Sequence, residues 1–182
     1  MSWLDEIKAY EPQDAQEEKD QEKILQFCKN HDNALFRENV AGHFSSSGFI
    51  VNPARDKVLM VYHLIFQTYA WTGGHIDGEE DFLEVAIKEA MEETGLQKLT
   101  QLTPIIALDV LPVQAHIKNG QPVIAHDHFN VTYAFEADES QVLVVKGDEN
   151  SDVKWIKIKE LEKWVKEKEM IKVYQKILKR LI

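Results

Sequence analysis

The segment from Asp81 to Thr94 constrains the fold more than any other, because its ends and its periodicity all indicate one helix. Asp81 and Glu84 have the spacing of an acidic capping box, and Gly95 stands where a left-handed C-terminal cap is expected. The apolar side chains between these ends share one half of the helix: Phe82, Leu83, Val85, Ala86 and Ala90. The pattern predicts an amphipathic helix over about 81–94 that packs on a core.

Three carboxylates lie on the same half of this helix. At about 100° per residue, Glu89, Glu92 and Glu93 fall within an arc of roughly 100°, whereas Glu84 and Lys88 point to the other side. A glutamate-rich helix is ordinarily a solvated face, but the shared phase with the apolar residues predicts acids that point inward. Partly buried like charges require a cation, and carboxylate oxygens are ligands that Mg²⁺ prefers. The spacing therefore indicates a metal site.

Short β-rich runs surround this helix, and further helices are expected at both ends of the chain. An apolar stripe predicts a C-terminal helix from about Glu160, and Asn119-Gly120 is typical of a tight hairpin turn. The predicted strand segments are 44–51, 57–69, 104–117, 122–137, 142–145 and 153–158. We divide the chain into a helical N-terminal extension, residues 1–38, packed on one main domain, residues 39–182.

Net charge and cysteine content bear on partners and compartment. The formal charge of −10 disfavours nucleic acid and anionic membranes, but a small phosphorylated ligand is compatible if a bound divalent cation reverses the local field. The single cysteine, Cys28, excludes an internal disulfide, and the first ten residues lack the pattern of a signal peptide. We expect a cytoplasmic protein with neither nucleic-acid nor membrane partners.

The helix belongs to a longer motif: Gly74, five residues, Glu80, seven residues, and then Lys88-Glu89-Ala90-Met91-Glu92-Glu93-Thr94-Gly95-Leu96. It closely resembles the signature of the Nudix hydrolases, Gly-x5-Glu-x7-Arg-Glu-U-x-Glu-Glu-x-Gly-U, where U is a bulky aliphatic residue. Seven of the nine defined positions match, and such a match at a given start has a chance probability of about 10⁻⁸ to 10⁻⁷. The two departures are Ala90 at an aliphatic position and Lys88 at the arginine position. The resemblance covers about residues 40–160.

This resemblance implies an α/β/α sandwich with a mixed β-sheet and the activity of a Nudix-type pyrophosphohydrolase. Glu89, Glu92 and Glu93 would bind Mg²⁺, or Mn²⁺ in its place, together with the carbonyl of Gly73, while Glu80 would support the loop before the helix. The implied reaction is attack by a metal-activated water on phosphorus, which breaks a pyrophosphate bond in a nucleoside diphosphate linked to another group.

A general base is supplied in this family by the motif or by a later loop. Glu89 is the candidate within the motif, and Glu149 is the candidate in the acidic turn before the strand of Trp155. An ordinary exposed turn is the alternative interpretation for Glu149. The catalytic candidates are Glu89, Glu93 and Glu149.

Histidines provide further candidates. His126 and His128 alternate on a predicted strand, so both imidazoles project from one face together with Asn130. They are expected to contact substrate phosphate or to form a second metal site, although satisfied or exposed histidines are the alternative and no zinc-ligand spacing is present. The substrate-binding candidates are His75, Lys88, His126 and His128, with His43 and Arg37 near the first strand as further ones.

Other functions stay open at this stage. The ammonium of Lys88 does not reproduce the planar fork of arginine, which leaves a Nudix-fold module that binds a nucleotide without turning it over. Prenyl-diphosphate isomerisation, which some proteins of this fold perform with a cysteine, is disfavoured because Cys28 precedes the first core strand. The C-terminal helix either closes over the domain or pairs with a second copy, so a homodimer also stays open.

Overall fold

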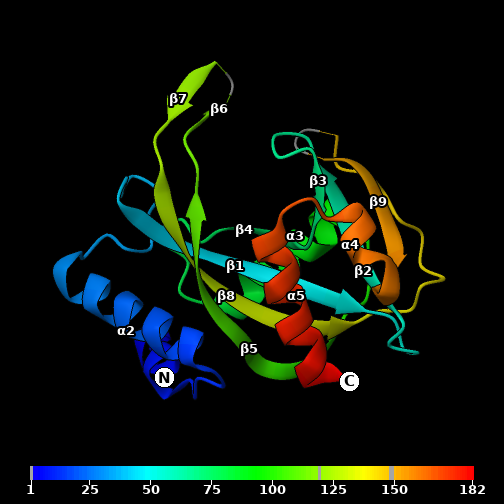
Figure 1. Ribbon diagram of the computed structural model, residues 1–182, viewed down its shortest axis with the longest axis horizontal. Coiled ribbons are helices and arrows are strands. Elements are labelled where there is room, and N and C mark those ends of the chain that lie inside the picture. Colours follow the sequence, from blue (N-terminus) through cyan, green and yellow to red (C-terminus); the bar gives the residue numbers. More distant parts are fainter. Residues whose placement is uncertain (1, 119, 148–149) are drawn as a thin grey trace.

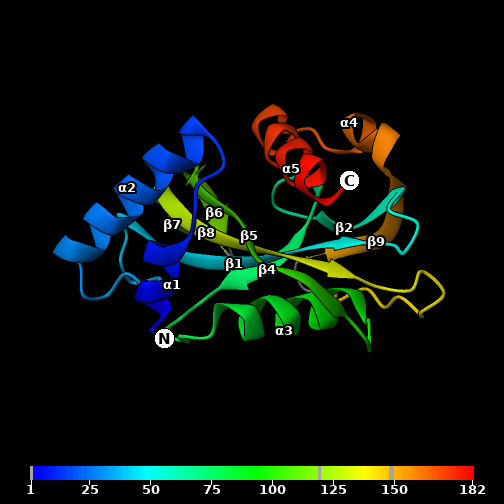
Figure 2. The same ribbon diagram turned by 90° about the horizontal axis from the view of Figure 1, so that it is seen from below.

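A mixed seven-stranded sheet lies between two layers of helices in the computed structural model, which describes residues 2–118, 120–147 and 150–182 (Figures 1 and 2). The strands of this sheet are β1 (Gly42–Val51), β2 (Lys57–His63), β3 (Thr68–Ala70), β4 (Thr72–His75), β5 (Thr100–Val113), β8 (His126–Glu136) and β9 (Asn150–Lys157). The helices are α1 (Trp3–Ala9), α2 (Ala15–Asn30), α3 (Phe82–Thr94), α4 (Leu161–Trp164) and α5 (Lys168–Leu181), with a 3-10 turn at Ile158–Glu160. The predicted sandwich is confirmed.

The centre of the sheet is the parallel pair β1 and β8, in register from Gly42 opposite Asp127 to Val51 opposite Glu136. The main strand order is β3-β2-β1-β8-β5, and the other pairings are antiparallel. On its other edge β1 pairs with β4 from Ser45 to Gly48 and with β2 at Ile50 and Val51. This arrangement brings the Gly-Gly segment of β4 against the middle of the sheet.

Each face of the sheet carries its own core. Below the sheet in Figure 2, α3 buries Phe82, Ala86 and Ala90 against strand residues such as Phe129. On the opposite face, α5 buries an apolar stripe that includes Ile177, in contact with strand residues of the second core. The predicted stripe of the C-terminal helix therefore closes over the sheet.

The ends of α3 lie where the caps predict them. Asp81 accepts a hydrogen bond from the backbone N–H of Glu84 at 2.9 Å, and Gly95 takes the left-handed conformation with φ of 77°. The backbone N–H of Val144 donates to the carbonyl of Thr94 at 2.8 Å, which satisfies one of the last helical acceptors. Because the 142–145 segment bonds to the helix end, it forms no strand, and that part of the prediction is wrong.

Two other predictions need refinement. The 57–69 run is two strands, β2 and β3, because the chain turns through Gln67 at a positive φ of 51°. The C-terminal helix is interrupted between α4 and α5, where the N–H of Lys166 donates to Thr68 Oγ1 at 2.9 Å.

The predicted hairpin is present as β6 (His116–Lys118) and β7 (Gln121–Val123), which projects from the body of the molecule in Figure 1. Asn119 lies outside the described residues. Among the helices in the described ranges, none combines the length and apolar character that crossing a membrane requires.

Candidate active site

A cavity of about 1290 Å³ opens beside α3 and β4. Its walls include side chains of β8, the β2–β3 connection and α5. Eight of the candidate site residues predicted from the sequence line it: Arg37, Gly73, His75, Lys88, Glu89, Glu93, His126 and His128. Glu149 lies outside the described residues. Tertiary structure thus brings most of the predicted site residues to one cavity.

Glu93 is the best-anchored acid of this cavity. Its side chain is buried, and both carboxylate oxygens accept hydrogen bonds. The backbone N–H of Gly73 donates to Oε2 at 3.0 Å, and the amide of Asn150 donates to Oε1 at 2.8 Å. These two donors hold the carboxylate in one orientation at the junction of α3, β4 and β9.

Glu89 lies one helical turn before Glu93 and packs against the same strand. A Cβ atom at Gly74 would stand 2.6 Å from both Cδ and Oε1 of Glu89, which is closer than real contacts allow. The first glycine of the motif therefore lets the carboxylate approach the backbone of β4. At Gly73 a Cβ would stand 2.7 Å from the carbonyl oxygen of Ser46, so this position also excludes a side chain.

Glu92 departs from the prediction that all three acids point inward. It is exposed and forms an ion pair with Lys146, at 2.9 Å between Oε2 and Nζ. The hydrogen bond to Glu92 raises the pKa of Lys146, and the charges of Glu89 and Glu93 raise it further. One ammonium group thus stands in the combined field of three carboxylates.

Lys88 and Glu84 are exposed, as expected from their helical phase on the side opposite the apolar residues, and both also line the cavity. The charge of Lys88 also contributes, after the hydrogen bond with Lys146, to a lowered pKa of Glu92. The cavity therefore extends over the edge of α3 that the helical phase predicted to face solvent. Glu80 is exposed in the loop before α3.

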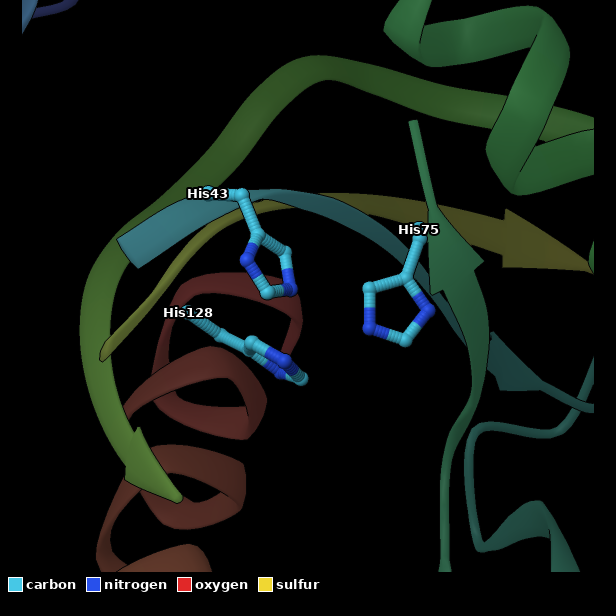
Figure 3. Close-up of side chains that lie close together, drawn as sticks. All are labelled: His43, His75 and His128. Carbon is cyan, nitrogen blue, oxygen red and sulfur yellow. The ribbon is translucent and has the colours of Figure 1, made fainter. Parts of the chain in front are cut away.

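Four histidines meet on the wall formed by β1, β4 and β8. His43, His75 and His128 turn toward one another (Figure 3), and His126 adjoins His43 and His128. Burial, followed by the charges of His75 and His43, lowers the pKa of His128 to about 2. Burial also lowers the pKa of His43. Both imidazoles are therefore uncharged at neutral pH.

Sequence reasoning missed two polar contacts of this site. Asn150 holds Glu93 from 57 positions away, and Lys146 pairs with Glu92 from 54 positions away. Neither has a local sequence signal, because both contacts arise only when the segment after β8 folds back over α3. Arg37, a further candidate, lines the cavity and forms an ion pair with Asp77.

Comparisons with known proteins identify the family and the fold. The family model described as "NUDIX domain" matches residues 42–181. A NUDIX-family hydrolase from Clostridium perfringens is 25% identical, with a TM-score of 0.54 over 77% of this chain and 98% of that one. The Ap4A hydrolase of C. elegans, as a binary complex, is 19% identical, with a TM-score of 0.57 over 76% of this chain and 96% of that one.

A third solved structure is the NUDIX domain of Shewanella oneidensis NrtR in complex with ADP ribose. It is 18% identical, with a TM-score of 0.53 over 86% of this chain and 97% of that one. These last two likenesses concern the fold. No curated protein matches the chain by sequence.

Proposed function

Because the chain belongs to the Nudix family and is a pyrophosphohydrolase of that type, we propose that it hydrolyses a nucleoside diphosphate linked to another group, with Mg²⁺ or Mn²⁺ as cofactor. The observation that carries this proposal is the convergence of Glu89 and Glu93 on the Gly-Gly segment of β4 beside a large cavity. Carboxylates fixed in this way are suited to a hard divalent cation.

The donor set fits such a cation. The raised pKa of Lys146, to which the hydrogen bond and charge of Glu92 and the charges of Glu89 and Glu93 contribute, supports a cation in the field of these glutamates. We propose that Glu89, Glu92, Glu93 and the carbonyl of Gly73 hold the ion. The ion pair between Lys146 and Glu92 would break when the ion binds. Such an ion would supply positive charge for the pyrophosphate oxygens and would make a bound water a better nucleophile.

The chain's own groups position and activate the reactants. Gly73 N–H and the Asn150 amide hold the carboxylate of Glu93 in place. We propose that a carboxylate oxygen of Glu89 takes the proton of the attacking water, with Glu149 as the alternative base. Each is tested by its own Gln variant, and the base is the one whose loss removes the acidic limb of the pH profile, where activity falls as the base is protonated.

The cavity's other polar side chains face the substrate in this proposal. Lys88 would neutralise phosphate charge, and His75, His126 and His128 would contact the substrate from the strand wall. A volume of about 1290 Å³ exceeds the ~300–1,000 Å³ of common small-ligand pockets, which favours a substrate of two joined parts. ADP ribose, bound by the S. oneidensis domain, and Ap4A, named for the C. elegans hydrolase, are of this kind.

The partners in this proposal are small phosphorylated molecules. With a formal charge of −10, the chain repels polyanions such as nucleic acid and anionic membranes. A cytoplasmic location accords with the single cysteine.

The test is a substrate panel with the purified full chain and Mg²⁺, comprising nucleoside triphosphates, ADP ribose and dinucleotide polyphosphates. We expect product release from at least one class, and Glu93→Gln should lower kcat/KM by about 10³-fold or more. Glu169→Gln, an exposed change on α5, is the control. Full activity of a folded Glu93→Gln variant would refute the mechanism.

The same panel separates hydrolysis from nucleotide binding without turnover. Binding alone is the second candidate function because Lys88 replaces the arginine of the motif. Thermal stabilisation by a nucleotide with no turnover would favour the binding module. Turnover gained in Lys88→Arg would then identify the lysine as the cause.

A further inference from the structure

The histidine cluster is built by pairing strands that are distant in the sequence. His43 on β1 lies directly opposite His128 on β8, and His75 on β4 pairs with Ser45, two residues along β1. The ring centroids of His43, His75 and His128 are 5.0 Å apart in each pair. Strands of one sheet therefore hold the rings in place, which suits a site that needs fixed geometry.

His43 presents an unused lone pair to this cluster. Its Nδ1 lies 3.1 Å from the carbonyl oxygen of Asn39, and because a carbonyl only accepts, Nδ1 carries the proton and Nε2 does not. The side chain is 4% exposed, and within the described part of the chain no group hydrogen-bonds to its Nε2. An unsatisfied buried acceptor costs about 1–3 kcal/mol, so its presence indicates a ligand that completes the site.

His126 is oriented by the same kind of contact. Its Nδ1 lies 2.8 Å from the carbonyl oxygen of Ile124, which leaves Nε2 as the lone-pair atom. That Nε2 lies 3.1 Å from Nε2 of His128, so in the absence of an ion it accepts a hydrogen bond from the His128 N–H. Two nitrogens that bind one Zn²⁺ at about 2.1 Å stand roughly 3.0–3.4 Å apart. A carbonyl that fixes the far ring nitrogen is also the usual support of a metal-binding histidine.

We infer that His43, His75 and His128, with His126 beside them, bind a borderline divalent transition-metal ion, for which Zn²⁺ is the reference. One ring nitrogen from each of the first three lies within 4.8 Å of the others, so small ring rotations bring them to ligand distance. Imidazole nitrogens favour Zn²⁺ and similar ions, whereas carboxylate oxygens favour Mg²⁺. This site is therefore distinct from the glutamate site.

The position of the cluster also indicates access. His75, His126 and His128 line the cavity described above, so an ion held by three imidazoles keeps a coordination position that water or a phosphate oxygen reaches from that cavity. The inference does not depend on hydrolysis, because it concerns nitrogen ligands on the strand wall rather than the acids of α3.

Zinc binding by the chelator-stripped full chain in saturating Mg²⁺, which occupies the carboxylates, tests the inference. We expect one tightly bound Zn²⁺ in competition with a chromophoric chelator, and nitrogen neighbours at about 2.0–2.1 Å in X-ray absorption. His43→Ala and His128→Ala should each weaken binding by about 10- to 100-fold or more. His31→Ala, whose ring stacks on Phe27, is the matched control.

Glu93→Gln separates the two metal sites, since it should leave the zinc affinity unchanged. Absence of stoichiometric Zn²⁺, oxygen-only neighbours, or equal affinity in His43→Ala, His128→Ala and the control would overturn the site. If a histidine variant does not fold, the absorption spectrum of the unaltered protein decides the result by itself.

Discussion

Replacement of Glu17 by glutamine should lower the stability of the whole molecule, although Glu17 lies in α2, far along the chain from the motif. Its side chain is fully buried between α2 and α5. Oε1 lies 2.7 Å from Arg180 and 3.0 Å from Lys176. Oε2 accepts hydrogen bonds from Tyr10 at 2.8 Å and from the backbone N–H of Gln13 at 3.0 Å. This carboxylate therefore joins the first and last helical segments.

The magnitude follows from the pKa of Glu17. Burial by itself raises this pKa, but the hydrogen bond from Arg180 and the other partners outweigh burial and lower the pKa from 4.5 to about 2. The difference, 4.5 − 2, is about 2.5 units, and at 1.36 kcal/mol per unit it corresponds to about 3 kcal/mol. Loss of one partner from a buried ion pair costs a similar ~3–5 kcal/mol. We expect Glu17→Gln to lower the free energy of unfolding by about 3 kcal/mol at pH 7.

The pH dependence provides an independent check. Because the folded pKa lies below the unfolded value, the stabilisation is complete above about pH 4.5 and is lost as the pH falls toward 2. The difference between the unaltered protein and Glu17→Gln should therefore fall below half its neutral value by about pH 3.

Urea denaturation followed by circular dichroism at neutral pH and at about pH 3 measures both effects. Glu18→Gln, an exposed change at the next residue, is the control and should shift stability by no more than about 0.5 kcal/mol. A loss under about 1 kcal/mol at pH 7, or a difference that does not shrink in acid, would refute the reasoning.

Two further changes address the glutamate site. Gly74→Ala places a methyl group 2.6 Å from Cδ of Glu89. Because the flexible Glu89 side chain can move away, we expect an unchanged melting temperature but a fall in kcat/KM of about 10²-fold. Unaltered kinetics would argue against a role for Glu89. Lys146→Met removes the ammonium that competes with a metal for the carboxylates, so half-maximal activity should require several-fold less Mg²⁺. Lys57→Met, which breaks an ion pair with Glu139, is the control, and a higher Mg²⁺ requirement for Lys146→Met would contradict the competition.

Local patterns predicted the parts of the molecule that depend on near neighbours. The limits of α3 follow from Asp81 and Gly95, which act within one turn of the helix ends. The inward position of Glu93 follows from helical phase. Phase failed for Glu92, which is exposed and pairs with Lys146 from a segment 54 positions away. The strand predicted over 142–145 failed for a related reason, since its backbone bonds to the end of α3.

The sequence by itself therefore determined the helix that carries the acids, through short-range periodicity, and the family, through the spacing of its motif. The sandwich of helices around a mixed sheet was implied by the resemblance to that family. Only the tertiary structure decided that Asn150 holds Glu93 and that His43 faces His75 and His128. The register of β1 with β4 and β8 creates the histidine cluster. Registers between distant strands are selected by burial over the whole sheet, so a local stretch of sequence does not predict them.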